Sequence, residues 1–350
     1  MGIKVSEFGK TSKGTETHLY TVVNGNGMAM ELSDYGATLV ALVVPDAKGR
    51  MDDVLLGYDH VQDYEQGTCY FGACIGRNGN RIKDAQAVIN GAVCQMDKNE
   101  GENSLHSGKD GYNGIIWEAE LHADENSVRF HHIGADGEQG LPGTFDVSVT
   151  YTLTEDNEVK IHYEGISDKD TIANMTNHGY YNLAGHASGN VENHVLWIDA
   201  PAFTPVGEGM IPTGEILSVA GTPMDFREAK KIGRDIEADY EQLKIAGGYD
   251  HNYVLAENDG SVRKVAEVSE ETSGRRMEIF TDAIGVQFYA GNFVESSPIG
   301  KDGVVYGKRA GFCMETQYFP DAVHHAAFPS CVLKAGEKYD TTTIYRFSVL

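Results

Sequence analysis

Amide, imidazole and carboxylate side chains gather in six short stretches of the sequence, each with aromatic or apolar residues among them. The stretches span residues 76–82, 103–108, 174–185, 248–253, 285–289 and 311–317. Planar hydrogen-bonding groups suit the hydroxyls of a polyhydroxylated ligand, and aromatic rings suit the apolar face of a sugar. These stretches therefore predict a binding site for a small molecule rich in hydroxyl groups.

Other kinds of site find little support in the sequence. It contains no G-x-G-x-x-G motif, Walker loop, H-E-x-x-H motif or G-x-S-x-G elbow. The pairs His131-His132 and His324-His325 are adjacent in sequence. Neighbouring side chains of a strand point to opposite faces, so such a pair cannot readily chelate one ion. We therefore expect these histidines to be structural or solvated.

The elements that must position these residues read as strands. Apolar and polar residues alternate over 145–153 and again over 159–163, on either side of a polar turn, which predicts an antiparallel hairpin. A second hairpin is predicted over 19–32, with an Asn-Gly turn at 24–27. Further strands are expected at 128–133, 195–198, 277–281, 286–289 and 343–349.

Helical signal is sparse. Ile232, Ile236, Tyr240 and Leu243 lie three or four residues apart and predict a helix within 228–244, although Gly233 weakens it. No Pro- or Ser-rich linker and no fixed-period repeat interrupts the chain. The sequence thus predicts one all-β domain over residues 1–350 with one or two short helices, built either as a large antiparallel β-sandwich or as an extended stack of sheets.

Charge and cysteine content narrow the partners and the compartment. The 350 residues carry a formal net charge of -24, which disfavours nucleic acid and anionic membrane surfaces. The N-terminal residues show no apolar stretch typical of a secretion signal. Five cysteines without C-x-x-C spacing do not suggest a disulfide framework, so we expect a cytoplasmic protein.

An ordered series of motifs gives the sequence a family resemblance. Tyr35-Gly36-Ala37-Thr38 comes first and Glu315-Thr316-Gln317 comes near the end. Between and after them lie the segments 54–58, 76–82, 103–106, 177–178, 211–216, 222–227 and 320–322. Together they resemble the aldose 1-epimerases, the galactose mutarotase family. Ser107 departs from the glycine usual in the family, a change that bears on the orientation of the neighbouring His106. Gly79 stands where alanine is common.

The resemblance implies a mutarotase-like supersandwich fold and an isomerase that interconverts the α and β anomers of free aldohexoses such as galactose or glucose. It implies acid–base opening and reclosure of the ring, with no cofactor, metal or covalent intermediate. Family members occur as monomers and as homodimers, so either state is expected. The implied partner is a small-molecule aldose.

The resemblance also assigns roles to individual residues. Glu315 matches the general base at the C1 hydroxyl, and His178 matches the general acid at the ring oxygen. We expect Glu315 to have an ordinary carboxyl pKa and to be ionised, and an acidic neighbour to favour protonated His178. The positions implied to bind sugar hydroxyls are Asn80, Arg81, His106, Asp250 and Gln287. Whether His106 also assists the acid stays open.

Structural interpretations remain beside these roles. For Glu315 the alternative is a structural salt bridge, and for His178 it is a buried histidine bonded to the backbone. For Arg81 the alternative is an ion pair with Asp84. Arg77, Tyr180 and Phe288 are equally compatible with lining a pocket and with packing in the core.

Three other functions remain open on the residues alone. Asp250 and Glu315 could form the carboxylate pair of a glycoside hydrolase, although His178 would then be unneeded. A hexose-6-phosphate 1-epimerase would ask for a basic cluster, and the best basic run, Lys230-Lys231, lies away from the motifs. A non-catalytic sugar-binding protein would be marked by loss of the acid or base, and both are present.

Overall fold

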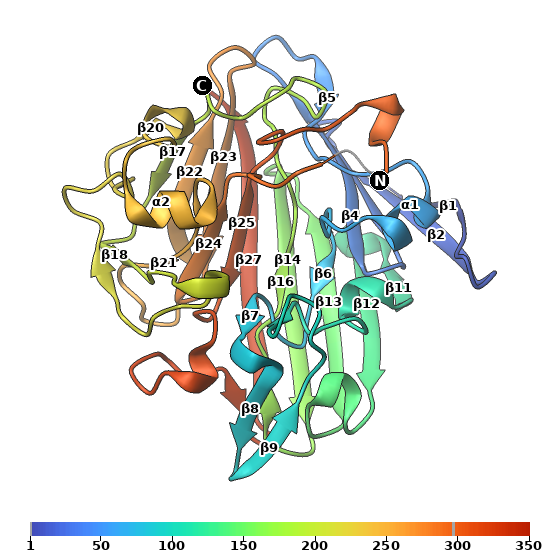
Figure 1. The fold of residues 1–350 in the computed structure, drawn as a ribbon. Helices are drawn as coiled ribbons and strands as arrows, with labels where there is room; N and C mark the ends of the chain where they lie inside the picture. Colours follow the sequence, from blue (N-terminus) through green and yellow to red (C-terminus); the bar gives the residue numbers. More distant parts are fainter. Residues whose placement is uncertain (1, 296–297) are drawn as a thin grey trace.

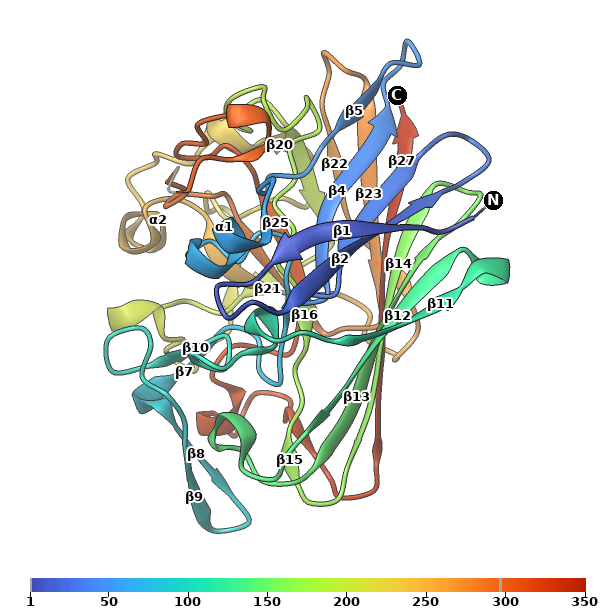
Figure 2. The same ribbon diagram turned by 90° about the vertical axis from the view of Figure 1, so that its right-hand side faces the viewer.

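Antiparallel β-sheets make up most of the regular secondary structure of the computed structural model, which describes residues 2–295 and 298–350 (Figures 1 and 2). The largest sheet has nine strands in the order β11-β12-β13-β14-β27-β23-β22-β17-β20. Their bounds are β11 Glu118–His122, β12 Ser127–Gly134, β13 Phe145–Leu153, β14 Glu158–Ser167, β17 Val195–Ile198, β20 Lys230–Lys231, β22 Arg263–Ser269, β23 Arg275–Thr281 and β27 Lys338–Val349.

Two five-stranded sheets accompany the large one. The N-terminal sheet runs β1-β2-β3-β4-β5, with bounds Lys4–Lys10, Glu16–Val23, Ala29–Ser33, Thr38–Pro45 and Met51–Asp53. The second, which we call the site sheet, runs β19-β18-β21-β24-β25. Its strands are β18 Ala202–Phe203, β19 Leu217–Ser218, β21 Asp250–Val254, β24 Gly285–Tyr289 and β25 Cys313–Gln317.

Short strand pairs and two short helices complete the regular structure. The pairs are β6 Cys74–Ile75 with β16 Thr176–Asn177, β7 Arg81–Ile82 with β10 Ser104–Leu105, β8 Gln86–Ile89 with β9 Ala92–Gln95, and β15 Thr171–Ile172 with β26 Val332–Leu333. The helices are α1 Val61–Gln66 and α2 Glu241–Ala246. The predicted fold class, all-β with antiparallel strands and one or two short helices, is confirmed.

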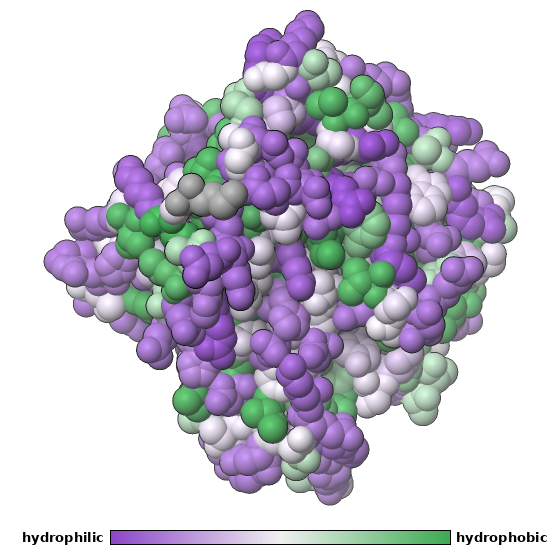
Figure 3. All heavy atoms as spheres, turned by 180° about the vertical axis from the view of Figure 1, so that it is seen from behind, coloured by the Kyte–Doolittle hydropathy of each residue, from purple (hydrophilic) through white to green (hydrophobic). Residues whose placement is uncertain are grey.

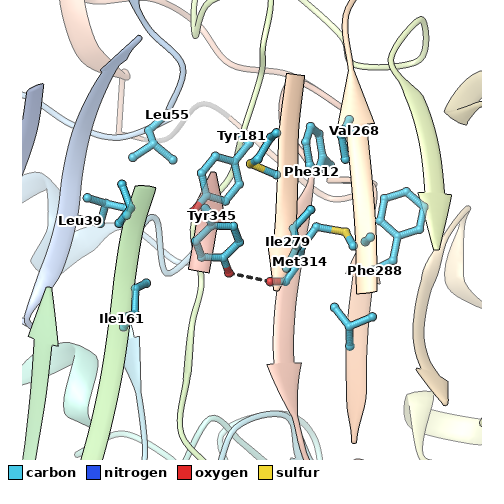
Figure 4. Packing of buried hydrophobic residues seen from close by; sticks show 14 of the residues in the cluster. Leu39, Leu55, Ile161, Tyr181, Val268, Ile279, Phe288, Phe312, Met314 and Tyr345 are labelled. Carbon is cyan, nitrogen blue, oxygen red and sulfur yellow. Dashed lines mark hydrogen bonds between the residues drawn. The ribbon is translucent and has the colours of Figure 1, made fainter. Parts of the chain in front are cut away.

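Alternating burial explains how the strands share one core. Along β14, buried residues alternate with partly exposed ones over most of the strand, as expected of a strand with one covered face. One apolar cluster includes Leu39 of the N-terminal sheet, Ile161 of the large sheet and Met314 of the site sheet (Figure 4). The Tyr345 hydroxyl donates a hydrogen bond of 2.8 Å to the Met314 carbonyl (Figure 4). The large sheet thereby supports β25 from behind.

Both predicted hairpins are confirmed. β13 pairs with β14, and β2 pairs with β3, in antiparallel register. The five further predicted strands also fall within strands of the structure, namely β12, β17, β23, β24 and β27.

The helix predicted within 228–244 is wrong over most of its length. Residues 230–231 form the edge strand β20, Ile232–Arg234 form a short 3-10 turn, and α2 begins only at Glu241. Ile232, Ile236 and Leu243 are nevertheless buried. Their spacing therefore reflects a coil that packs against the core rather than a helix.

The face seen in Figure 3 is mostly polar, and the cysteines form no disulfides. Seen from behind, the molecule is mostly hydrophilic, with separate apolar patches (Figure 3). All five cysteines are free thiols. No helix within residues 2–295 and 298–350 is long and apolar enough to cross a membrane.

Candidate active site

Three neighbouring strands of the site sheet bring polar side chains to one place. Gln287 of β24 lies opposite Glu315 of β25 on one side and opposite Asn252 of β21 on the other. In the next rung, Tyr289 lies opposite Asp250 and Cys313. Residues two apart share a face of a strand, so Cys313 and Glu315 point to the same side while Met314 points into the core. The strand period of two thus presents the carboxylates together.

His178 follows β16 and is fixed through its backbone. Its N–H donates to the Ala73 carbonyl at 3.0 Å, and its carbonyl accepts from the Gly72 N–H at 3.0 Å. These bonds tie it to the turn that precedes β6, and they bring its Nε2 to 3.7 Å from Oε2 of Glu315. On the other side of the ring, Nδ1 lies 3.6 Å from the Cys313 sulfur.

Asn80, Arg81 and His106 come together through the pair β7–β10. Leu105 lies opposite Arg81, and the His106 N–H donates to the Asn80 carbonyl at 3.1 Å. Ser107 has a left-handed backbone (φ +70), which explains why glycine suits this position. Its hydroxyl accepts from the Asn78 N–H at 2.8 Å and donates to the Asn78 carbonyl at 3.1 Å. The departure at Ser107 therefore ties the His106 loop to the neighbouring chain.

These groups surround a single cavity of about 230 Å³. Its lining residues are Thr68, Cys69, Tyr70, Asn80, Arg81, Leu105, His106, His178, Tyr180, Asp250, Tyr289, Phe293 and Glu315. A water molecule takes up about 30 Å³ of liquid volume, so the space corresponds to roughly seven or eight waters. A monosaccharide is of that size, whereas a polymer segment is not.

The carboxylates are buried, and this changes their acidity. Glu315 is 2% exposed and Asp250 is 9% exposed. Burial raises the pKa of Glu315 well above its ordinary value, the nearby Asp250 adds to the rise, and Arg81 opposes it. Burial also raises the pKa of Asp250, against the effects of Arg81 and of the Gln287 hydrogen bond. The expectation of an ordinary pKa for Glu315 is therefore wrong.

Burial acts on His178 in the opposite sense. It lowers the pKa of His178 to about 4, because a dry environment disfavours the charged imidazolium. The expectation that an acidic neighbour would keep His178 protonated is therefore wrong. In the His178–Glu315 pair both shifts favour a shared proton on Glu315 over one on His178.

Arg81 and Asp250 each have a neighbour that fixes their orientation. The Arg81 guanidinium donates through Nε and Nη2 to the two carboxylate oxygens of Glu100, both at 2.6 Å. The predicted alternative partner, Asp84, is not the one used. Gln287 donates from Nε2 to Oδ1 of Asp250 at 2.7 Å. An arginine held by two hydrogen bonds to one carboxylate directs its remaining N–H groups in a fixed direction.

His106 is held in one tautomer. The Asn80 backbone N–H donates to Nδ1 of His106 at 3.1 Å, so Nδ1 must carry a lone pair and the neutral ring carries its proton on Nε2. Burial lowers the pKa of His106 well below its ordinary value, and the neighbouring His178 and Arg81 add to this. His106 is therefore a neutral hydrogen-bond donor toward the cavity.

Two groups of side chains have ligand atoms close enough for a metal ion. In the first, His106, His178 and Glu315 bring one atom each to within 4.8 Å of one another. The fixed tautomer of His106 leaves its Nε2 protonated, which is unsuitable for coordination. In the second, Lys338 lies 2.7 Å from Glu164 and 2.9 Å from Asp340 and so already supplies the cation.

The predicted site residues mostly assemble. Asn80, Arg81, His106, His178, Asp250 and Glu315 line the cavity, whereas Gln287 is not among its lining residues and lies behind Asp250. Of the uncertain residues, Tyr180 lines the cavity, Phe288 packs in the core, and Arg77 is fully buried with bonds to the Ala135 and Gly143 carbonyls. The sequence did not identify Tyr70 and Cys313 as neighbours of His178, or Glu100 as the partner of Arg81.

Comparison with known proteins agrees with this geometry. Residues 18–346 match the family model described as aldose 1-epimerase. The chain belongs to the aldose 1-epimerase family. It is 40% identical over 342 residues to the galactose mutarotase of Bos taurus, which covers 98% of this chain and 97% of that protein. It is 36% identical over 336 residues to the aldose 1-epimerase of Escherichia coli K12, with 95% and 96% coverage.

Solved structures of aldose 1-epimerase relatives share the fold. An aldose epimerase homologue from C. elegans matches with a TM-score of 0.88 and 30% identity, over 95% of this chain and 99% of that one. A galactose 1-epimerase from Lactobacillus acidophilus matches with a TM-score of 0.85 and 26% identity, over 99% and 98%. The mutarotase-like fold and the assignment to the isomerases are thereby confirmed.

Proposed function

We propose that this aldose 1-epimerase interconverts the α and β anomers of free aldohexoses, with Glu315 and His178 as its proton-transfer pair. The observation that carries the proposal is the 3.7 Å between His178 Nε2 and Glu315 Oε2 in a cavity of monosaccharide size. The C1 hydroxyl and the ring oxygen of an aldose are bonded to the same carbon. An acid and a base that line one small cavity can therefore serve both oxygens.

In the proposed reaction Glu315 accepts the proton of the C1 hydroxyl while His178 protonates the ring oxygen, and the C1–O5 bond breaks. Rotation about C1–C2 turns the aldehyde, and return of both protons closes the ring on the other face. Arg81, Asp250, Asn80 and neutral His106 bind the hydroxyls. His106 in this assignment donates one hydrogen bond from Nε2 and moves no proton.

The pKa shifts support a direct energetic role for the pair. Ring opening converts an imidazolium and a carboxylate into neutral imidazole and neutral carboxylic acid. Burial favours this neutral state, since it raises the pKa of Glu315 and lowers that of His178. Before opening, the C1 hydroxyl donates to Glu315, whose Oε2 has no partner among the described residues, and so stabilises the ionised carboxylate. The free-energy cost of holding His178 and Glu315 in their charged forms is then recovered, because ring opening neutralises both groups.

The alternatives are less well supported by the cavity. Arg81 is the one cationic side chain among its described lining residues, and Glu100 already binds it, so a phosphate would lack a basic cluster. Lys230 is used by Asp235 at 2.8 Å. The Asp250–Gln287 hydrogen bond is compatible with Asp250 as an acceptor for sugar hydroxyls.

The function is tested by polarimetry on freshly dissolved α-glucose and α-galactose. We expect the protein to bring both sugars to anomeric equilibrium much faster than buffer does. Hexose 6-phosphates should be accelerated far less, because the described residues of the cavity offer no partner for their phosphate group. A reducing disaccharide serves as the control for hydrolysis. Cleavage of that disaccharide without faster anomer exchange would refute the proposal.

The pKa shifts predict an unusual pH profile. Ordinary values near 4.3 for Glu and 6.5 for His would make kcat/KM fall above about pH 6.5. The pair described here instead takes up its second proton near pH 4 and loses its last one only at the raised pKa of Glu315. After subtraction of the uncatalysed rate, we expect the titration of His178 to appear in kcat/KM near pH 4 rather than near pH 6.5. A decline centred on pH 6.5 would contradict this assignment.

The remaining proposals concern partners and setting. The net charge of -24 supports a small uncharged substrate over nucleic acid or an anionic membrane. Free thiols at all five cysteines are compatible with the cytoplasm. We propose that the chain acts as one domain, as a monomer or a homodimer.

A further inference from the structure

Tyr70 touches both histidines of the cavity. Its ring lies nearly parallel to that of His178, with centroids 5.8 Å apart and planes at 30°. It meets His106 edge-on, at 4.8 Å and 63°. Tyr180 also stacks on His178, at 5.0 Å and 24°, but Tyr180 belongs to a buried cluster. Tyr70 is the partly exposed member of this group and lines the cavity.

The backbone of Tyr70 is strained. Its φ of +57 lies in the left-handed region, which a bulky aromatic residue rarely adopts. Such a conformation persists only where its surroundings hold it. Here the Tyr70 carbonyl accepts from the Ala73 N–H at 3.1 Å, which closes a tight turn.

That same turn holds the main chain of His178. The Gly72 N–H and the Ala73 carbonyl bond to the two sides of the His178 peptide. The turn thus fixes the backbone of His178, and the ring of Tyr70 lies against its imidazole. The Tyr70 hydroxyl is near the Arg81–Glu100 ion pair, since Glu100 raises its pKa, after burial, while Arg81 lowers it.

We propose that Tyr70 is a positioning residue whose aromatic ring holds the imidazoles of His178 and His106 in the orientation that ring opening requires. The inference rests on the proposed roles of these histidines. Within residues 2–295 and 298–350, no carboxylate bonds to Nδ1 of His178, which lies 3.6 Å from the Cys313 sulfur. The ring faces must therefore supply the orientation that a carboxylate supplies to many catalytic histidines.

Three substitutions separate the ring from the rest of the side chain. Tyr70→Phe keeps the ring and should retain kcat within about twofold. Tyr70→Leu keeps apolar bulk but removes the flat face, and we expect kcat to fall about 10- to 100-fold, since small misplacements are that costly. KM should rise much less, because Arg81 and Asp250 remain. Tyr70→Asn suits a left-handed backbone and should lose kcat likewise without lowering the melting temperature greatly.

Tyr240→Leu is the matched control, because Tyr240 is a partly buried tyrosine outside the cavity. Equal losses in Tyr70→Phe and Tyr70→Leu would overturn the proposal, because the hydroxyl would then be responsible. Wild-type kcat in Tyr70→Leu would overturn it as well. Both outcomes leave the function intact if Glu315→Gln is inactive, whereas a wild-type protein without anomer exchange would refute the function itself.

Discussion

Glu315→Gln should lower the rate of anomer exchange about a thousandfold while sugar binding stays close to that of the unchanged protein. Glutamine has nearly the shape of glutamate but cannot accept the proton of the C1 hydroxyl, and general-base catalysis contributes about 10²- to 10⁴-fold. Polarimetry gives the rate, and calorimetric titration with galactose gives the affinity. Arg81, Asp250 and His106 still bind the hydroxyls, so the loss should appear in kcat rather than in KM.

Unlike its activity, the stability of Glu315→Gln should equal or exceed that of the wild type. Oε2 of Glu315 is buried and lacks a hydrogen-bond partner among the described residues, and burial disfavours the ionised carboxylate, so a neutral amide of nearly the same shape should suit the site at least as well. We expect the melting temperature of Glu315→Gln to equal or exceed that of the wild type. Glu118→Gln is the control, because its side chain is 85% exposed. A variant that exchanges anomers at the wild-type rate would exclude Glu315 as the base.

His178→Gln should cause a loss of similar size, again about 10²- to 10⁴-fold in kcat. Glutamine can still donate a hydrogen bond to the ring oxygen, but it cannot transfer a proton to it. The ring oxygen would then have to leave C1 without protonation, which is the difficult step. The same polarimetric assay over a range of galactose concentrations separates kcat from KM.

The double variant sharpens this result. If both residues serve one proton transfer, Glu315→Gln with His178→Gln should be about as slow as either single variant, because groups that act as a unit are not additive. His122→Gln, a change at a partly exposed histidine of β11, is the control. Losses that multiply in the double variant would mean that the two residues act independently. Activity of His178→Gln within tenfold of wild type would assign the acid to another group.

The strands were predictable because their signal is local. Alternation over 145–163 is written in the side chains themselves, and β13 and β14 follow it. The region 228–244 misled because burial every third or fourth residue also arises in coil. A Cβ on Gly233 would lie 2.8 Å from the Cβ of Glu192, so the chain there is shaped by a distant segment. Helix α1 was missed because only Val61 of it is buried.

The site was predictable in its residue types but not in its energetics. Sequence motifs carry the identity of Glu315 and His178, and six of the seven predicted residues line the cavity. They say nothing of how deeply the two side chains are buried, and burial shifts both pKa values against the expected charge states. Glu100 and Tyr70 were missed because their roles depend on contacts made only after the chain folds, 19 residues apart for Arg81 and Glu100.

The alternation of Glu315 and Met314 along β25 bears on how this protein can evolve. A one-residue insertion or deletion there would exchange the two faces of the strand, sending the carboxylate into the core and a thioether into the cavity. The exposed segment 257–262 connects β21 to β22 and carries no such constraint. Length variation among descendants should therefore collect in that loop, while β25 changes only by substitution.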